Sequence, residues 1–147
     1  MSVIALLDVN VLVALFDPDH VHHEPAHHWF AEHRSSGWAT CPLTENGVLR
    51  MLGNPAYSQS AAQAVPLLAH LQAFCASGGH RFWPDDVSLR DSDLFAVGAA
   101  PGHRQLTDLY LLGLAVKHGG CLATFDRAIP ITKVRGAGPR NMALLPA

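Results

Sequence analysis

The feature that most constrains this chain is a short apolar segment near its start that ends in an acid. Residues 3–7 (Val-Ile-Ala-Leu-Leu) are all apolar, and Asp8 follows them directly. A run this short and continuous predicts a strand buried on both faces, as in the parallel sheets of α/β proteins. Because a lone carboxylate is costly to bury, Asp8 needs a donor or a cation beside it. The sequence therefore predicts a buried strand with a polar site at its carboxyl end.

Length and composition favour one folded domain. The chain has 147 residues, of which 49% are hydrophobic and 15% charged, which excludes a disordered protein. Its formal net charge of −2 argues against a protein that coats nucleic acid through bulk charge, although a local basic patch is compatible with it. Cys41, Cys75 and Cys121 are widely spaced, so we expect small buried thiols rather than a disulfide framework or a zinc site. We expect a single cytoplasmic domain spanning residues 1–147, without a membrane segment.

Strand-like and helical segments alternate along the rest of the chain. Further strands are expected at residues 38–41, 80–83, 121–125 and 142–144. Helices are expected from about Pro25 to Gly37, after Pro42 with Thr44 as N-cap, from about Ser60 to Cys75, and from about Arg104 to His118. Residues 85–102 are expected to form a short helix and an irregular connection. This alternation predicts an α/β fold with a mostly parallel sheet covered by helices on both faces.

Four acids occupy comparable places in this pattern. Asp8 and Asp126 follow strands, while Glu45 and Asp108 lie in the expected first turns of two helices. Strand carboxyl ends and helix N-termini share one rim of an open parallel sheet, so the four carboxylates can converge there. Helix N-termini offset their repulsion by only about 0.3–1 kcal/mol each, so some acids are protonated or a divalent cation is bound. Oxygen ligands favour Mg²⁺ or Mn²⁺, and such a site is suited to phosphodiester hydrolysis.

Four motifs occur in order along the chain: Asp8-Val9-Asn10, Thr44-Glu45 with Arg50 downstream, Gln105-Leu106-Thr107-Asp108, and Thr124-Phe125-Asp126. In order and spacing they resemble the PIN-domain nucleases over essentially the whole chain. The size, the histidine-rich first loop and the stretch Phe82-Trp83-Pro84-Asp85 resemble in particular the VapC toxins of bacterial VapBC toxin–antitoxin pairs. The resemblance implies a three-layer PIN-like fold with a five-stranded parallel sheet and Mg²⁺- or Mn²⁺-dependent endoribonuclease activity. It also implies a homodimer that a small cognate VapB-like antitoxin inhibits.

The resemblance also implies roles for individual residues. Asp8, Glu45 and Asp108 would be the principal metal carboxylates, with Asp126 completing the site directly or through water. The groups that would orient these acids by hydrogen bonds are Asn10, Thr44 and Thr124. Possible contacts to the RNA substrate are Arg50, Arg104, Arg127, Lys133 and Arg135.

Six histidines lie between residues 20 and 33, and His23 and His27 are one helical turn apart. Because Trp29 and Phe30 mark the core-facing side of this helix, we expect most of the histidines to be solvated. A zinc site is the less favoured alternative.

Three other functions remain open. One is a PIN nuclease of RNA processing without an antitoxin, and another is a catalytically silent module whose acids bind a metal or a partner. The third is a phosphotransferase of the haloacid-dehalogenase type, with Asp8 as nucleophile. The third is disfavoured because Asn10 occupies the place where that chemistry needs a second aspartate as general acid.

Overall fold

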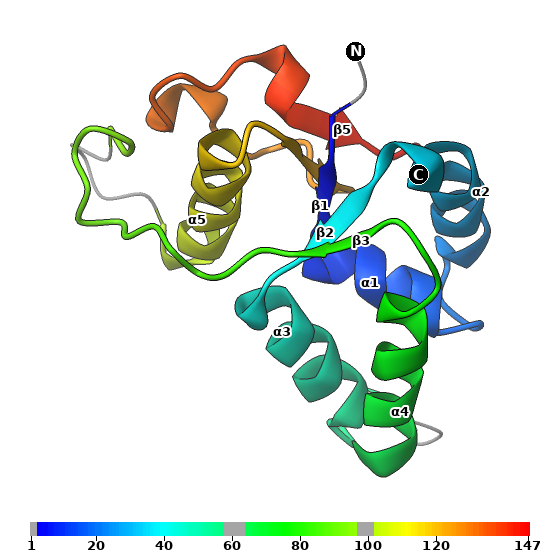
Figure 1. The fold of residues 1–147 in the computed structure, drawn as a ribbon. Helices are drawn as coiled ribbons and strands as arrows, with labels where there is room; N and C mark the ends of the chain where they lie inside the picture. The colour runs from blue at the N-terminus through cyan, green and yellow to red at the C-terminus, as the bar shows by residue number, and fades with distance from the viewer. Residues whose placement is uncertain (1–2, 58–63, 97–101) are drawn as a thin grey trace.

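The computed structural model describes residues 3–57, 64–96 and 102–147, which are built around a five-stranded sheet (Figure 1). All the strand pairs are parallel, and the order across the sheet is β3-β2-β1-β4-β5. The strands are β1 (Ala5–Leu7), β2 (Trp38–Thr40), β3 (His80–Phe82), β4 (Cys121–Thr124) and β5 (Met142–Leu144). The predicted strands and the predicted α/β sheet are therefore confirmed, and the sheet is parallel throughout.

β1 lies in the middle of this sheet. Its Leu6 pairs with Ala39 of β2 on one side, and its Leu7 pairs with Ala123 of β4 on the other. From β1 the chain first builds the sheet outward through β2 and β3, and then returns to the other side for β4 and β5. The strand order therefore reverses beside β1. In open α/β sheets, ligands bind at the carboxyl ends of the strands that flank such a reversal.

Helices cover both faces, and side chains alternate between them along each strand. Ala5, Leu7 and Trp38 face the core under the first four helices, whereas Leu6 and Ala39 face α5 (Figure 1). The helices are α1 (Val9–Phe16), α2 (His23–His33), α3 (Pro42–Gly53), α4 (Ala64–Cys75) and α5 (His103–Lys117). In the described part of the chain, no helix has the length and apolar character needed to cross a membrane.

The sequence patterns did not predict α1, and the starts of α2 and α3 differ from the prediction. α2 begins at His23, two residues before Pro25, and α3 begins at Pro42 with Cys41 as its N-cap. The assignment of Thr44 as N-cap was wrong because proline is well suited to the first helical position, where no backbone N–H is required. The predicted helix start near Ser60 lies outside the described residues.

The predicted short helix within residues 85–102 does not form in the described part, residues 85–96. Side chains there bond to nearby backbone: the Asp93 amide donates to the Asp91 carboxylate and the Arg90 amide to the Ser88 hydroxyl. Such local bonds compete with helix formation. The segment is held instead by an antiparallel bridge between Phe95 and Val134. Residues 97–101 lie outside the description.

α1 and α3 cross closely at Gly47. A Cβ atom at Gly47 would lie 2.6 Å from Cγ2 of Val9, a distance that no side chain tolerates without a shift. The glycine therefore lets α3 approach the first residue of α1. Since Asp8 precedes Val9 and Glu45 lies two residues before Gly47, this crossing sets the spacing between two of the predicted site acids.

Candidate functional site

Asp8 is held at the junction of β1 and α1. Only 5% of its surface is exposed. Its Oδ2 accepts a hydrogen bond of 2.7 Å from the Thr124 hydroxyl, and its Oδ1 accepts one of 2.7 Å from the Val9 amide, so it also caps α1. Burial nevertheless raises the pKa of Asp8, and the charge of Asp126 acts in the same direction against these two hydrogen bonds. The buried carboxylate predicted from the sequence thus has donors beside it but no positive charge from a side chain among the causes of its shift.

Asp108 and Asp126 share the environment of Asp8. Asp108 is the sixth residue of α5, and therefore lies in its second turn rather than in its first. Burial raises the pKa of Asp108 to about 7, and the charge of Asp8 and both a hydrogen bond and the charge of Asp126 add to this rise. These electrostatic effects place Asp8, Asp108 and Asp126 in one charged environment. Their oxygen atoms do not all lie within 4.8 Å of one another, so in the described residues the three acids share a region without forming a closed set of ligands.

The Thr124 hydroxyl links two members of what we call the aspartate cluster (Asp8, Asp108 and Asp126), namely Asp8 and Asp126. It donates to Asp8, and it accepts from the Asn10 side-chain amide at 3.2 Å and from the Asp126 backbone amide at 3.0 Å. Thr124 is fully buried at the carboxyl end of β4. Because one hydroxyl binds residues on both sides of the strand reversal, it fixes the position of Asp8 relative to Asp126.

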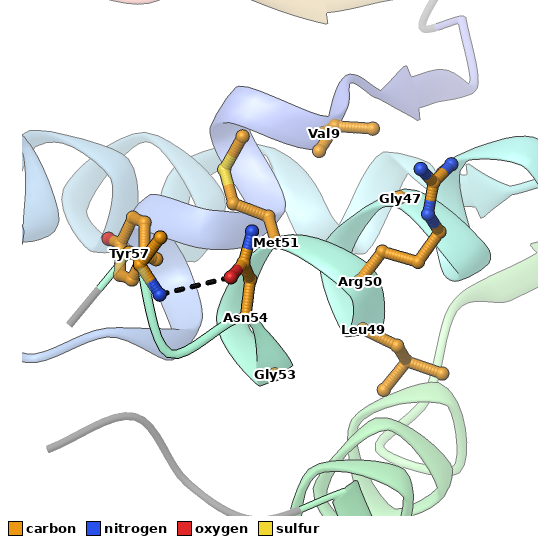
Figure 2. Close-up of a pocket in the computed structure, with 9 residues that line it drawn as sticks. Val9, Gly47, Leu49, Arg50, Met51, Gly53, Asn54 and Tyr57 are labelled. Atoms are coloured by element: carbon orange, nitrogen blue, oxygen red, sulfur yellow. Dashed lines mark hydrogen bonds between the residues drawn. The ribbon is translucent and has the colours of Figure 1, made fainter. Parts of the chain in front are cut away.

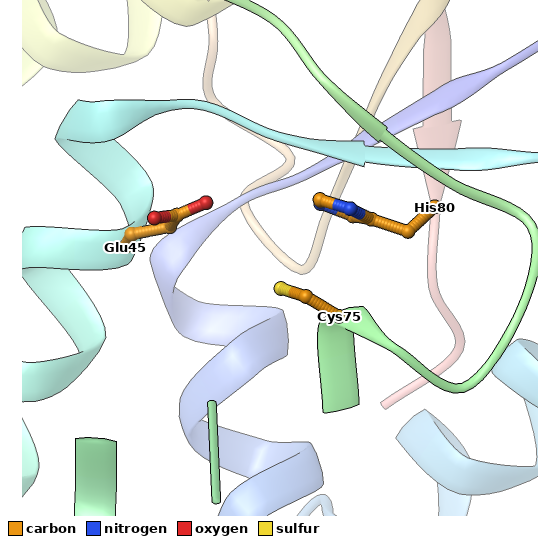
Figure 3. Close-up of side chains that lie close together, drawn as sticks. All are labelled: Glu45, Cys75 and His80. Carbon is orange, nitrogen blue, oxygen red and sulfur yellow. The ribbon is translucent and has the colours of Figure 1, made fainter. Parts of the chain in front are cut away.

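Glu45 faces a different set of groups. Its Oε2 accepts a hydrogen bond of 2.7 Å from the hydroxyl of Thr40, which lies 2.7 Å from Nε2 of His80. Since the hydroxyl gives its single hydrogen to Glu45, the His80 ring donates to Thr40 through an Nε2–H group. Ligand atoms of Glu45, Cys75 and His80 all lie within 4.8 Å of one another, and Figure 3 shows the three side chains pointing toward one another.

The charge of Glu45 acts within this second cluster, which we call the Glu45 cluster (Glu45, Cys75 and His80). Burial raises the pKa of the Cys75 thiol, and the Glu45 carboxylate raises it further. Burial lowers the pKa of His80, while Glu45 opposes that change. The thiol is therefore protonated and the imidazole neutral near pH 7.

The sequence patterns did not identify Cys75 and His80 of the Glu45 cluster as site residues. They also missed Thr40, whose hydroxyl links Glu45 to His80. Thr40 carried a usable signal, because it is a polar residue at the end of a buried strand, as Thr124 is. Cys75 was expected in the core, but it is half-buried at the end of α4. Cys75 and His80 are brought together by a turn through Gly78 and Gly79, both at positive φ, which the spacing of the chain does not reveal.

Thr44 is fully buried and makes its hydrogen bonds to Cys41. Its hydroxyl accepts from the Cys41 amide at 3.0 Å and donates to the Cys41 carbonyl at 3.1 Å. The residue thus fastens the start of α3 and so positions Glu45, the next residue. Its hydroxyl is engaged by this backbone rather than by an acid.

Two grooves run beside α3, and none of the four predicted site acids lines either of them. The larger, of about 830 Å³, is lined by residues that include Val9, Arg50, Met51 and Tyr57 (Figure 2). The smaller, of about 410 Å³, is lined by Val9, Asn46, Arg50 and Thr107, among others. Val9, Asn46 and Thr107 each adjoin a predicted site acid in the sequence, so the smaller groove passes close to the rim. Arg50 is exposed and lines both grooves.

The other basic residues singled out in the sequence lie in less defined settings. Arg127 is exposed and Lys133 half-buried, while the Arg135 guanidinium donates to the Ser92 carbonyl at 2.9 Å. The side chain of Arg104 lies outside the described part of the structure. Within residues 3–57, 64–96 and 102–147, no ion pair joins Arg50, Arg127, Lys133 or Arg135 to an acid.

Two of the clustered histidines have a structural role. Nδ1 of His23 bonds to the Ala14 carbonyl at 2.8 Å, and Nε2 of His27 bonds to the Leu15 carbonyl at 2.9 Å. These carbonyls belong to the last turn of α1, which leaves them without partners inside the helix. The histidines therefore cap α1, and across the described residues no group of three metal-ligating side chains includes them.

Comparison with known proteins gives several close relatives, although no family model matches the chain. The chain is 43% identical over 143 residues to Ribonuclease VapC44 of Mycobacterium tuberculosis, and the match covers 96% of this chain and 99% of the relative. It is 46% identical to Ribonuclease VapC39 and 48% identical to Ribonuclease VapC38 of the same organism, each over 125 residues and 85% of this chain. These matches cover 90% and 86% of the two relatives.

Proposed function

The chain belongs to the VapC ribonucleases, a family of PIN-domain endoribonucleases, and from this membership we propose that it is the toxin of a type II toxin–antitoxin pair. Its reaction would be the metal-dependent hydrolysis of RNA phosphodiester bonds at the carboxylate rim. The observation that supports the proposal is the aspartate cluster at the strand reversal, where burial raises the pKa values of Asp8 and Asp108, the charge of Asp126 adds to both shifts, and the charge of Asp8 adds to that of Asp108.

The donor set of the aspartate cluster fits a hard divalent cation. The three side chains offer only oxygen atoms, which Mg²⁺ and Mn²⁺ prefer. Burial first and neighbouring carboxylates second raise the pKa values of Asp8 and Asp108, so a bound cation would stabilise the ionised acids. Asp8, Asp108 and Asp126 would hold the cation, with Glu45 as the fourth carboxylate. When bound, such a cation lowers the pKa of water and stabilises charge that develops on phosphate oxygens.

The remaining parts of the site would position the acids and the substrate. Thr124 and Asn10 hold Asp8 against β4 through a chain of hydrogen bonds, which limits its motion during turnover. Arg50 lies along both grooves beside α3 and offers an unpaired guanidinium among the described residues, so it is suited to bind the RNA backbone. Arg127, Lys133 and Arg135 would extend this contact, as would Arg104.

The decisive experiment compares the wild type with Asp8→Asn on total RNA in Mg²⁺ or Mn²⁺, with an EDTA control. The new 5′ ends are mapped by sequencing. We expect cation-dependent cuts at defined positions that disappear with Asp8→Asn, because the amide keeps the shape of the side chain but lacks the charge. Asp91→Asn, at an exposed turn, is the matched control and should cut like the wild type. Equal cutting by the wild type and Asp8→Asn would overturn the proposal.

We further propose that the protein works in the cytoplasm as a homodimer and is inhibited by a small VapB-like antitoxin. The test is to search beside its gene for a small reading frame, co-express any product found there with this protein, and measure co-purification and the mass of the complex by light scattering. A tight complex that no longer cleaves RNA supports the toxin assignment. An active nuclease that binds no such product would support the alternative of a PIN nuclease in RNA processing.

A further inference from the structure

We propose that Glu45, Cys75 and His80 form a second cation site, which takes a thiol-binding divalent cation such as Zn²⁺. The three side chains come from α3, the end of α4 and the start of β3, and they converge beside Thr40 at the end of β2 (Figure 3). Together they present one oxygen, one sulfur and one nitrogen ligand. This set differs in kind from the oxygen-only aspartate cluster.

The spacing of the ligand atoms is close to what zinc requires. They lie within 4.8 Å of one another. Zinc bonds of about 2.0–2.3 Å at tetrahedral angles place neighbouring ligand atoms roughly 3.3–3.6 Å apart, so closure on the cation takes side-chain movements of about 1 Å. All three residues are half-buried, so they retain room for that movement and a path from solvent.

The chemistry of the set also favours zinc over magnesium. Zinc is bound by cysteine, histidine and carboxylate ligands, whereas Mg²⁺ takes oxygen ligands and keeps several waters. Three protein ligands leave the fourth position of a tetrahedron to water. The thiol proton is released to solvent as the sulfur binds, so that the three ligands and the cation carry no surplus negative charge. In the cation-free protein the Thr40 hydroxyl bonds both Glu45 and Nε2 of His80. A zinc ion that binds Nε2 displaces the bond from His80, and the ring proton moves to Nδ1.

Zinc binding at this site would inhibit catalysis, and this regulatory role rests on the proposed function. Glu45 is shared, because it is also the fourth carboxylate of the proposed nuclease site. A zinc ion that holds Glu45 in its observed position, toward Cys75 and His80, keeps it from joining the aspartate cluster. Zinc at concentrations near that of the protein therefore inhibits cleavage in Mg²⁺.

The binding test uses Co²⁺, which replaces Zn²⁺ and gives a thiolate-to-metal absorption band in the near ultraviolet. We expect the wild-type protein to develop this band at one equivalent and to lose it when Zn²⁺ is added. Cys75→Ser should abolish the band. His80→Ala should weaken cation binding by more than the roughly 10–100-fold that follows loss of an outer contact.

The controls each remove one thiol or one imidazole outside the Glu45 cluster. Cys121→Ala removes a thiol on β4, and His28→Ala removes an exposed imidazole of α2, so both variants should keep the band. A band that survives Cys75→Ser, or that disappears with Cys121→Ala in a folded protein, would overturn the second site. Circular dichroism establishes that each variant is folded.

A cleavage assay then tests inhibition separately. Each variant is normalised to its own rate in Mg²⁺ without zinc, and Zn²⁺ is added up to a few equivalents. We expect strong inhibition of the wild type and of His28→Ala, and at least a tenfold higher zinc requirement for Cys75→Ser. Equal inhibition of wild type and Cys75→Ser would overturn the regulatory role. Should the wild type cleave no RNA at all, the proposed function fails while the Co²⁺ band still decides the metal site.

Discussion

The two halves of the rim follow the same strand-end rule yet present different chemistry. At β1 and β4, Thr124 links Asp8 to Asn10 and to the Asp126 backbone, so the groups that gather there are oxygen-rich. At β2, Thr40 occupies the corresponding strand end, but it links Glu45 to the imidazole of His80. A buried threonine hydroxyl at a strand end thus holds a nearby acid by a hydrogen bond. The residues around that strand determine which other group the hydroxyl binds.

The halves also differ in rigidity. Asp8 is 5% exposed and Thr124 fully buried, so the packed centre of the sheet confines Asp8, whereas Asp108 and Asp126 are half-buried. Glu45 and His80 are half-buried, and β3, which carries His80, is an edge strand. Water can replace a lost partner on the Glu45 side but not around Asp8. Equivalent substitutions should therefore have larger effects in the aspartate cluster.

The largest expected effect is on catalysis, through loss of one carboxylate from each half. Asp108→Asn should lower the rate of Mg²⁺-dependent RNA cleavage by roughly 10²–10³-fold, because it removes charge from the centre of the cluster. Glu45→Gln should lower it by about 10²-fold, because the longer side chain is the more weakly confined ligand. Initial rates on a single RNA substrate measure both. A Glu45→Gln enzyme as active as the wild type would assign Glu45 to the second cluster alone.

The two threonines provide a matched pair with a smaller effect. Thr124→Val leaves a carboxylate and two donors unpaired in a buried place, so we expect a loss of about 1–3 kcal/mol in the free energy of unfolding. Cleavage should fall by roughly 10–100-fold, since Asp8 loses its orienting contact. Thr40→Val should cost less than about 1 kcal/mol because water can reach Glu45 and His80. Urea unfolding and initial rates give both quantities, and equal losses in the two variants would contradict the difference in rigidity.

The smallest effect is the pH dependence of stability in EDTA. The pKa of Asp108 is about 7 in the folded protein and 3.8 without the fold, so the folded state binds more protons between these values. The free energy of unfolding should therefore fall as the pH rises from about 4 to about 7. Because water screens this half-buried group, Asp108→Asn should stabilise the cation-free protein by only about 1–2 kcal/mol near pH 8.

Urea unfolding of the wild type and Asp108→Asn at acidic and weakly alkaline pH measures this difference. The variant should lose most of the pH dependence, and Mg²⁺ should reduce it in the wild type by offsetting the repulsion between carboxylates. Asp91→Asn, outside the cluster, should keep the wild-type slope. A wild type whose stability is flat or rises over this pH range would show that the acids are not coupled.

Helix starts and irregular segments were the parts of the fold that sequence patterns predicted least well. Thr44 was predicted as the N-cap because Ser, Thr and Asp are favoured caps. In the structure Cys41 alone separates the end of β2 from Pro42, which begins α3. The second turn position of Asp108 likewise follows from a helix that starts at His103. Such boundaries depend on packing that local preferences do not contain.

The sequence by itself determined the parallel sheet, because continuous apolar segments between helical patterns can be buried only in its interior. It also determined that acids follow or adjoin the strand ends, since those positions are fixed by the order of the residues. Only the tertiary structure decided which groups each acid meets. Cys75 and His80 reach Glu45 through a turn and an edge strand, and Thr124 reaches Asp8 across 116 residues of chain. Contacts of this kind depend on strand order, which no local pattern in the chain encodes.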